Sequence, residues 1–242
     1  MCGAASRDWR EVVMRWDWLP TYLPLLIHGL YVTLVILVFS VIVGFAMAVP
    51  IALVQVTGSW PARLLAKSFT NYIRGTPLLT QLWLLYYGIG SIFPLIPGMR
   101  EHFMWLIRLD AFYYALLAFT LSFAGYEAEI MRGAFLSVPR GELEAARSFG
   151  MSPWKVTSRV WFPRAVLQVL PTLTGEVISQ LKSTPLVFTL PVLDLMAGIS
   201  KVRQDTFLTY EPLIFLAVIY MILTYILTRA FGYLERLIPT RR

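Results

Sequence analysis

The sequence predicts an all-α integral membrane protein, and three observations lead to this fold class. Hydrophobic residues make up 57% of the 242 residues and Asp, Glu, Lys and Arg only 14%, whereas a soluble domain has about 25% charged residues. The mean hydropathy is +0.65, which also excludes a disordered chain. Long charge-free runs alternate with short basic segments, as in membrane spans joined by loops. We therefore predict five transmembrane helices.

The first charge-free run begins after Asp17 and ends before Arg63. We expect one helix at about 23–55, because a break at Gly44 or Pro50 would leave backbone groups unsatisfied within lipid. A span needs about 20 apolar residues to cross ~30 Å of hydrocarbon. On this basis the remaining spans are predicted at about 70–92, 111–134, 164–184 and 211–233.

The spans form one transmembrane domain, 23–236, between an N-terminal segment, 1–22, and a short tail, 237–242. Counting Lys and Arg in alternate loops places the N-terminus outside and the C-terminus inside, with 13 basic residues in the inner segments and 7 in the outer ones. The tail and the large basic loop after the third span are then cytoplasmic.

Composition excludes several other functions. The formal net charge of +7 does not indicate nucleic-acid binding, because the basic residues are spread between apolar runs. The single cysteine, Cys2, rules out an internal disulfide or a CxxC site. His28 and His102 lie far apart, so no metal site is expected. No G-x-x-x-x-G-K-[ST] sequence is present, and any ATP-driven activity needs another chain.

Charged residues inside predicted spans are candidates for function, because a charge at mid-bilayer costs about 2.5–3.5 kcal/mol on insertion scales. Glu176 lies twelve residues after Arg164, about 18 Å along a helix. It is expected either to bind a cationic group or to pair with another charge. Lys182 is six positions further, on a different face, and is expected to snorkel to the outer interface. Glu127 and Ser122 could line the same pathway.

Residues 140–165 predict a helix–turn–helix on the cytoplasmic side, with its helices within about 142–162. Gly150 suits the left-handed position that ends the first helix. Ser152 is expected as an N-cap, Pro153 as the first helical residue, and Pro163 as a bend into the next span. The small side chains within this helix would let another surface come close. The residues alone leave open whether this surface meets a protein or lipid headgroups.

The spacing of this loop resembles that of a known family. Glu144-Ala145-Ala146, three residues, Gly150, nine residues and Val160-Trp-Phe-Pro163 are similar to the EAA loop of bacterial ABC importer permeases. Three further segments resemble motifs of the polar amino acid permeases in the same order: Ile73 to Leu78 (RGTP), Ala128 to Ala134 (AEIxRGA) and Gly175 to Leu186. The resemblance is strongest to permeases for histidine, lysine, arginine, ornithine and opines, and covers about residues 20–235.

The resemblance implies the type I (MetI-like) permease fold and a non-catalytic subunit in the bacterial inner membrane with a periplasmic N-terminal segment. The implied partners are a homologous second permease, expected as a heterodimer, two ATP-binding subunits and a periplasmic binding protein. No cofactor is expected on this chain, since ATP and Mg²⁺ belong to the partner ATPase. The EAA helix would act as a coupling helix that switches the pore when the ATPase closes.

Site residues follow from the residues and the resemblance together. The ATPase-coupling residues are Glu142, Glu144, Ala145, Ala146 and Gly150. The substrate pathway is assigned to Glu176, Ser122, Glu127, Ser183 and Thr184. A structural or gating role is assigned to Arg74, Gly75, Thr76, Pro77, Glu129 and Arg132, with Glu129 and Arg132 expected as an i,i+3 ion pair.

Two other classes of function are alternatives. A membrane enzyme acting at the headgroup level would need clustered acidic or histidine residues, and Glu142 with Glu144 is the only close pair in the main loop. A secondary transporter working alone usually has two related halves, and no internal repeat is present. An ATPase that co-purifies with the chain would separate the importer from both alternatives.

Overall fold

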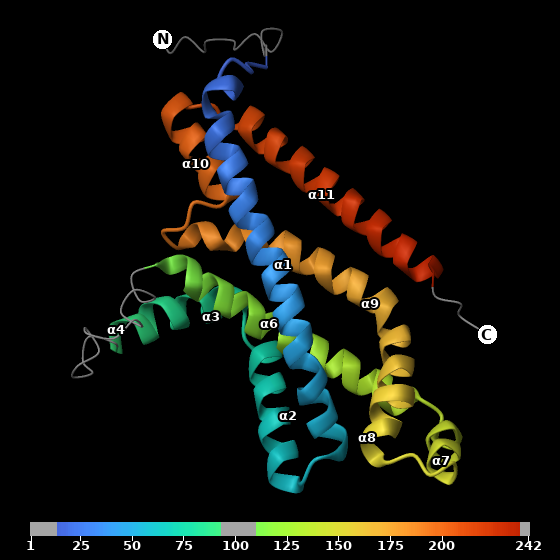
Figure 1. Cartoon of the computed structure of the whole chain (residues 1–242). Helices are drawn as coiled ribbons and strands as arrows, with labels where there is room; N and C mark the ends of the chain where they lie inside the picture. The colour runs from blue at the N-terminus through green and yellow to red at the C-terminus, as the bar shows by residue number, and fades with distance from the viewer. Residues whose placement is uncertain (1–13, 93–109, 238–242) are drawn as a thin grey trace, which may run out of the picture.

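The computed structural model describes residues 14–92 and 110–237, and within these ranges all regular elements are helices. Four long helices dominate the architecture (Figure 1): α1 (Leu19–Thr57), α6 (Ala111–Ser137), α9 (Phe162–Ser183) and α11 (Tyr210–Leu237). The shorter helices are α2 (Trp60–Gly75), α3 (Leu78–Trp83), α4 (Gly90–Ile92), α7 (Arg140–Ser148), α8 (Pro153–Val156) and α10 (Leu195–Thr206). Two π-helices (Leu84–Ile89, Thr157–Trp161) and a 3₁₀ helix (Thr184–Thr189) link them.

The first charge-free run forms one helix, as the sequence predicts. α1 continues through Pro24 and Pro50 for 39 residues, about 58 Å at ~1.5 Å per residue. It packs most extensively on α6, and Gly44 permits the close approach: a Cβ there would lie 3.0 Å from both Phe123 Cδ1 and the Thr120 carbonyl oxygen. α1 and α11 are the two described helices long and apolar enough to cross a membrane by length and composition.

The helix expected over 70–92 is divided in two. Residues up to Gly75 belong to α2, an amphipathic helix whose buried residues are Thr70 and Ile73, and a new helix begins at Leu78. The break follows from Pro77, since the residue before a proline avoids the helical region, and Thr76 has φ −117° and ψ 140°. The first part of the expected span is therefore a separate helix that packs on α6.

The loop between α6 and α9 has the predicted helix–turn–helix form. α7 ends at Ser148 with Phe149 as its C-cap, and Gly150 takes the left-handed conformation with φ +76°. Ser152 occupies the N-cap position of α8 and Pro153 follows it, although the Ser152 side chain makes no capping hydrogen bond.

Pro163 does not end a helix, contrary to expectation. Helical residues continue without interruption from Pro153 through the π-helix into α9. Pro163 lies at the beginning of α9, directly after the π-helix. A wider π turn changes the hydrogen-bond register, which accommodates a proline that donates no N–H. The result is one continuous helical segment from 153 to 183.

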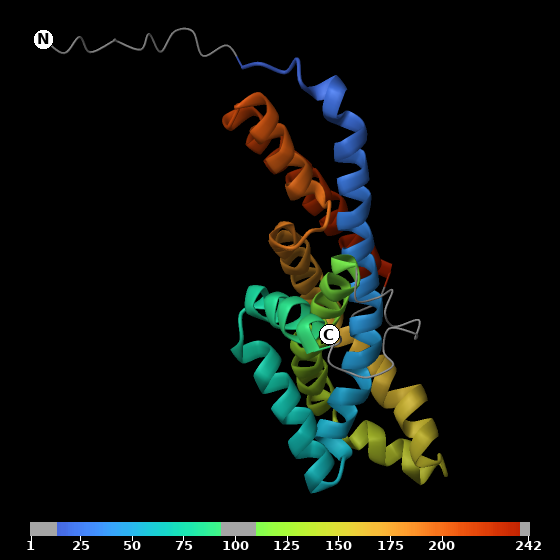
Figure 2. The same cartoon turned by 90° about the vertical axis from the view of Figure 1, so that its left-hand side faces the viewer.

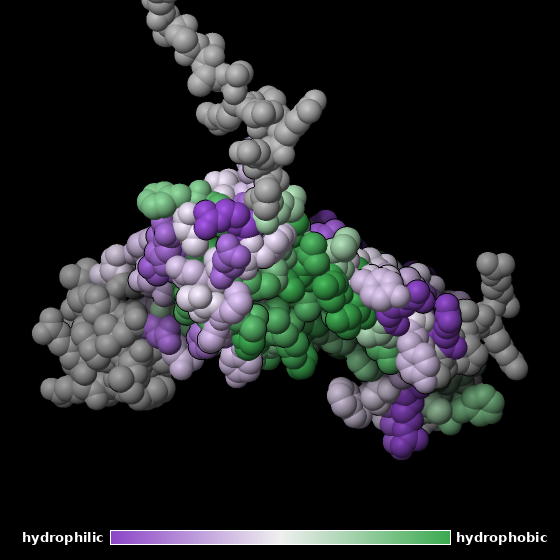
Figure 3. Space-filling model, turned by 90° about the horizontal axis from the view of Figure 1, so that it is seen from above, coloured by the Kyte–Doolittle hydropathy of each residue, from purple (hydrophilic) through white to green (hydrophobic). Residues whose placement is uncertain are grey.

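The apolar core is distributed along the long axis of the molecule, with α1 contributing to each part. At one end Leu26 packs with Ile199 of α10, in the middle Leu37 packs with Leu181 of α9, and at the other end Ala52 packs with Met131 of α6. Figures 1 and 2 show α10 at the end opposite to α2, α7 and α8. Seen along this axis, a hydrophobic region lies between hydrophilic ones (Figure 3).

Candidate functional site

A polar cavity of about 220 Å³ lies between α3, α6 and α9 in the middle of the helices. Its acidic group is Glu176 of α9, and most of the other lining side chains carry hydroxyl or amide groups. The lining residues are Leu78, Ser122, Phe123, Tyr126, Glu176, Ser179, Gln180 and Ser183. Three residues predicted for the substrate pathway, Ser122, Glu176 and Ser183, thus come together from two helices.

Gln180 fixes the wall that carries Glu176. Its Nε2 donates to the backbone oxygen of Phe119 at 2.8 Å and to Ser40 Oγ at 3.3 Å, so one buried amide joins α9 to α6 and α1. A buried amide without partners would be costly, and these two bonds therefore set the position of α9. Gln180 was not predicted, because an uncharged amide four residues after Glu176 belongs to no motif and its two partners are distant in sequence.

Glu176 opens to this cavity and forms no ion pair with a described residue. Lys182 lines a different cavity, between α9 and α11, which agrees with the sequence inference that the two do not share a helix face. The guanidinium of Arg74 lies 5.9 Å from the ring centroid of Tyr126, a lining residue. A carboxylate next to hydroxyl groups is suited to bind an ammonium or guanidinium group, although the nearby Arg74 already supplies one positive charge at the border of the cavity.

Two other residues predicted for the pathway do not line this cavity. Glu127 is fully buried, and neither of its carboxylate oxygens has a hydrogen-bond partner among the described residues. Thr184 is also buried, and its hydroxyl lies 2.8 Å from that of Tyr220 in α11. The structure therefore places Glu127 within the helix packing and Thr184 in the contact between α9 and α11.

Glu129 and Arg132 form the predicted ion pair, with Arg132 Nε and Glu129 Oε2 2.9 Å apart. Glu129 also accepts a hydrogen bond of 3.1 Å from Thr70 of α2, and Thr70 in turn accepts one of 3.2 Å from Gln55 of α1. This network joins α6, α2 and α1. Glu129 and Arg132 therefore hold these helices together.

The Arg74-Gly75-Thr76-Pro77 turn is held by a side chain that the sequence analysis did not single out. Gln81 Nε2 donates to the Ile73 oxygen at 2.8 Å and to the Thr76 oxygen at 3.1 Å. These bonds satisfy carbonyls at the end of α2, where a helix leaves its last four without intrahelical partners. The turn is thereby fixed between α2 and α3.

The predicted coupling residues divide into two groups. Glu144, Ala145 and Gly150 are exposed, so another molecule can reach them. Ala146 is buried, and Glu142 forms an ion pair of 2.9 Å with Arg164 at the start of α9. The exposed residues Glu144, Ala145 and Gly150 thus form a surface that another molecule can contact, whereas the Glu142–Arg164 pair attaches α7 to α9.

Two further contacts describe the surroundings of this loop. Trp161 Nε1 donates to the Phe135 oxygen at 2.8 Å and holds the base of α9 against α6. Beside Gly150, Phe149 and Trp154 are 87% and 75% exposed. Large exposed apolar side chains in the same loop favour a protein contact.

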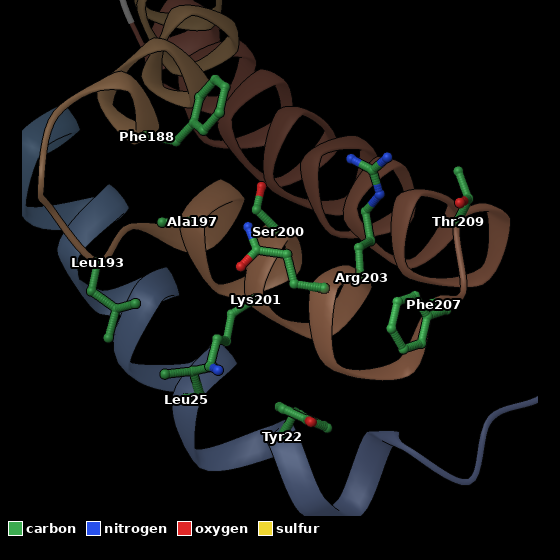
Figure 4. Close-up of a pocket in the computed structure, with 11 residues that line it drawn as sticks. Tyr22, Leu25, Phe188, Leu193, Ala197, Ser200, Lys201, Arg203, Phe207 and Thr209 are labelled. Atoms are coloured by element: carbon green, nitrogen blue, oxygen red, sulfur yellow. The ribbon is translucent and has the colours of Figure 1, made fainter.

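At the opposite end a larger cavity, about 960 Å³, lies between α1, α10 and the segment before α10 (Figure 4). Lys201 and Arg203 are its cationic side chains. Lys201 pairs with Asp205 at 2.9 Å, and Tyr22 donates to the other oxygen of this carboxylate at 3.0 Å. The hydrogen bond from Lys201 holds the pKa of Asp205 below its ordinary value. Arg203 is partly buried, and its Nε has no hydrogen-bond partner among the described residues.

Comparison with known proteins gives the chain its family. Residues 2–239 match the family described as binding-protein-dependent transport system inner membrane component. The chain belongs to this family. It is a non-catalytic permease subunit of an ABC importer in the inner membrane, and it works with a substrate-binding protein and with separate ATPase subunits that hydrolyse ATP.

The curated relatives are transport permeases of similar length. The chain is 38% identical over 218 residues to the octopine transport system permease protein OccM of Rhizobium radiobacter, covering 90% of this chain and 87% of the relative. It is 34% identical over 213 residues to the histidine/lysine/arginine/ornithine transport system permease protein HisM of Salmonella typhimurium, covering 86% and 87%.

Solved structures agree with this assignment. The crystal structure of an amino acid ABC transporter with histidines superposes with a TM-score of 0.78 at 31% identity, covering 93% of this chain and 99% of that one. An inward-facing structure of the MetNI methionine ABC transporter superposes with a TM-score of 0.71 at 19% identity, over 89% and 97%, and shows the fold alone. The permease therefore has the MetI-like fold.

Proposed function

We propose that this permease translocates polar, basic amino acids or opines, and that Glu176 binds the cationic group of the substrate. The observation that carries the proposal is the polar cavity, in which an unpaired carboxylate is surrounded by Ser122, Ser179 and Ser183. The names of the relatives, which transport octopine or histidine, lysine, arginine and ornithine, agree with a cationic substrate. Opines of arginine keep the guanidinium group and fit the same chemistry.

The path through the membrane is proposed to consist of five spans: α1, the segment 78–92, α6, α9 and α11. The proposed orientation has the N-terminal segment, 1–22, in the periplasm and the tail, 237–242, in the cytoplasm. The positive-inside count supports this orientation. α7 and α8 then lie on the cytoplasmic side, and the cavity of Lys201 and Arg203 faces the periplasm.

Coupling to ATP is proposed to occur through α7, with ATP and Mg²⁺ held by the partner ATPases. Glu144, Ala145 and Gly150 would contact the ATPase, and Glu142 would transmit the movement to α9 through Arg164. A homologous second permease, different from this chain, is proposed to complete the pore. The sequence motifs resemble those of histidine-type permeases, and this resemblance supports a pore built from two different permease subunits.

The test of the proposed function is ATP-driven uptake by the complete complex in proteoliposomes. We expect uptake of arginine, histidine, ornithine or an opine, and Glu176→Gln should lower it by about tenfold or more, since a hydrogen bond to a charged group contributes about 1.5–3 kcal/mol. The matched control is Glu127→Gln, the same change at a carboxyl outside the cavity, and we expect a much smaller loss. Equal losses from both variants would remove Glu176 from the substrate site.

A further inference from the structure

The cavity of Glu176 has a cation at its border that the proposed function does not use. Arg74 is the residue before the last one of α2, and its side chain is exposed. Its guanidinium lies 5.9 Å from the ring centroid of Tyr126, which lines the cavity. Arg74 forms no ion pair with any residue that the structure describes. An open carboxylate and an open guanidinium thus belong to the same polar site.

The turn after α2 fixes where Arg74 begins. Gln81 Nε2 donates to the carbonyl oxygens of Ile73 and Thr76, at 2.8 and 3.1 Å, and so binds the chain on both sides of Arg74. The turn leads directly to Leu78, which starts α3 and lines the cavity. The aromatic ring then holds the guanidinium itself, because a cation within about 6 Å of a ring centroid is attracted to it. Arg74 is therefore directed to the cavity by its own surroundings.

Arg74 and Glu176 are near each other but are not in contact. The charge of Arg74 attracts the Glu176 carboxylate, yet the two side chains form no ion pair. They are held on different elements, since the turn after α2 carries Arg74, and Gln180 binds α9 with Glu176 to α6 and α1. Charged side chains at membrane depth face a partner or a cavity. The space between them is suited to a molecule that carries both a cation and an anion.

The chemistry of the two groups indicates which anion the molecule carries. A guanidinium is a planar fork of N–H donors that matches the two oxygens of a carboxylate. Every amino acid has such a carboxylate next to its ammonium group, whereas a simple amine or guanidine does not. The hydroxyl groups of Ser122, Ser179 and Ser183 line the same cavity and can donate to the carboxylate or accept from the cation.

We propose that Arg74 binds the carboxylate of the substrate while Glu176 binds its cationic group, so that this permease selects amino acid zwitterions over simple cations. The proposal rests on the proposed function for the role of Glu176. It adds a second recognition residue and with it a substrate class, molecules in which a carboxylate accompanies the cation. Opines have an additional carboxylate and keep this contact. The role differs from the structural or gating role that the sequence predicts for Arg74.

Equilibrium binding of arginine and agmatine to the purified membrane complex tests this role. Agmatine is arginine without its carboxylate, and the periplasmic binding protein is left out so that only the membrane subunits can distinguish the two. The unmodified complex should bind arginine about tenfold more tightly than agmatine, as expected for a hydrogen bond between charged groups. Arg74→Gln should lower the affinity for arginine to that for agmatine and leave the affinity for agmatine unchanged.

Arg63→Gln is the matched control, the same change at an exposed arginine near the other end of α2. Its guanidinium donates to the Gly58 oxygen at 3.1 Å, and the preference for arginine should remain. A preference that survives Arg74→Gln would overturn the carboxylate contact. An equal loss for both ligands would also overturn it, because a merely structural role of Arg74 lowers both affinities, and so would the absence of any preference in the unmodified complex.

Glu176→Gln distinguishes this inference from the proposed function. It should weaken arginine and agmatine by the same factor, since both carry the cation. If it weakens neither ligand, or if the unmodified complex binds no arginine, the proposed function fails and the inference fails with it. If it weakens both while Arg74→Gln leaves the preference intact, the cation site stands and only the carboxylate contact is wrong.

Discussion

Glu176 and Gln180 lie four residues apart on α9 and have different tasks. Gln180 is bound to α6 and α1, whereas Glu176 has no such partner and faces the cavity. The sequence predicted a functional role for Glu176, because a charged side chain within an apolar span is costly unless it faces a cavity or a partner. It could not predict Gln180, because an uncharged amide has no motif and its partners, an oxygen 61 residues away and a hydroxyl 140 residues away, depend on the fold.

The proposed contact of α7 with the ATPase gives a prediction at the scale of single residues. Glu144→Lys reverses an exposed charge, and Gly150→Asp places a side chain at φ +76°, where a non-glycine residue costs about 1–2 kcal/mol. Both variants should abolish transport-coupled ATP hydrolysis while the chain still inserts into the membrane. The measurement is substrate-stimulated ATPase activity in proteoliposomes.

A charge reversal at the same end of the molecule serves as the control for these variants. Lys67 is an exposed residue of α2, outside the loop, and Lys67→Glu should leave the stimulated ATPase activity close to normal. If Glu144→Lys and Gly150→Asp also hydrolyse ATP normally, α7 is not the contact with the ATPase.

At the scale of elements, the long apolar helices were predictable and the breaks between helices were less so. Hydropathy locates α1 and α11, because each is a long uninterrupted run of apolar residues that is sufficient to cross a membrane. The division at Thr76 was missed, although Pro77 was the signal, because the expected span extended the apolar run across it. The continuation through Pro163 was missed because a π turn before a proline is set by packing, here by Trp161 against Phe135.

The contact between α1 and α10 gives a prediction for an element pair. A Cβ on Gly29 would lie 2.7 Å from the backbone oxygen of Asp194, and α10 begins directly after this residue with its N-terminus bound to Thr33 Oγ1 at 3.2 Å. Gly29→Ala should therefore destabilise the permease by about 1–3 kcal/mol, the usual cost of overpacking. Thermal unfolding in detergent measures it.

Gly133 is the matched control for this substitution. It also lies within a long helix, α6, but a Cβ there meets no atom within 4 Å. Gly133→Ala should be neutral or slightly stabilising, because alanine favours a helix more than glycine does. A Gly29→Ala variant as stable as Gly133→Ala would show that α1 and α10 do not pack this closely.

For the whole molecule, composition was enough to predict an all-α membrane protein, and the loop spacing was enough to predict the family, which the comparisons confirm. The residues predicted for the substrate pathway are brought together only in part. Ser122, Glu176 and Ser183 meet in one cavity, but Glu127 and Thr184 do not, because a helix of 3.6 residues per turn directs neighbours in sequence to different faces. Only the packed bundle decides which of these faces lies against the cavity.

The orientation of the molecule can be tested with a single new cysteine. Cys2 is the only cysteine, so Cys2→Ser provides a background without thiols. Ser148 and Gln204 are exposed at opposite ends, in α7 and α10. In intact cells, with the outer membrane made permeable, an impermeant maleimide should label Gln204→Cys and not Ser148→Cys. The reverse labelling pattern would invert the proposed orientation and move α7 away from the ATPase.

The unbroken helical segment from 153 to 183 has a mechanical consequence. Its lower end is attached to α7 through the Glu142–Arg164 pair, and its upper part carries Glu176 on the cavity wall. Because no loop lies between Arg164 and Glu176, we expect a displacement of α7 to reach the cavity wall through the helix itself. Pro171, within α9 between Arg164 and Glu176, donates no backbone hydrogen bond, so this position is where greater flexibility would uncouple the base from the cavity wall while leaving both ends intact.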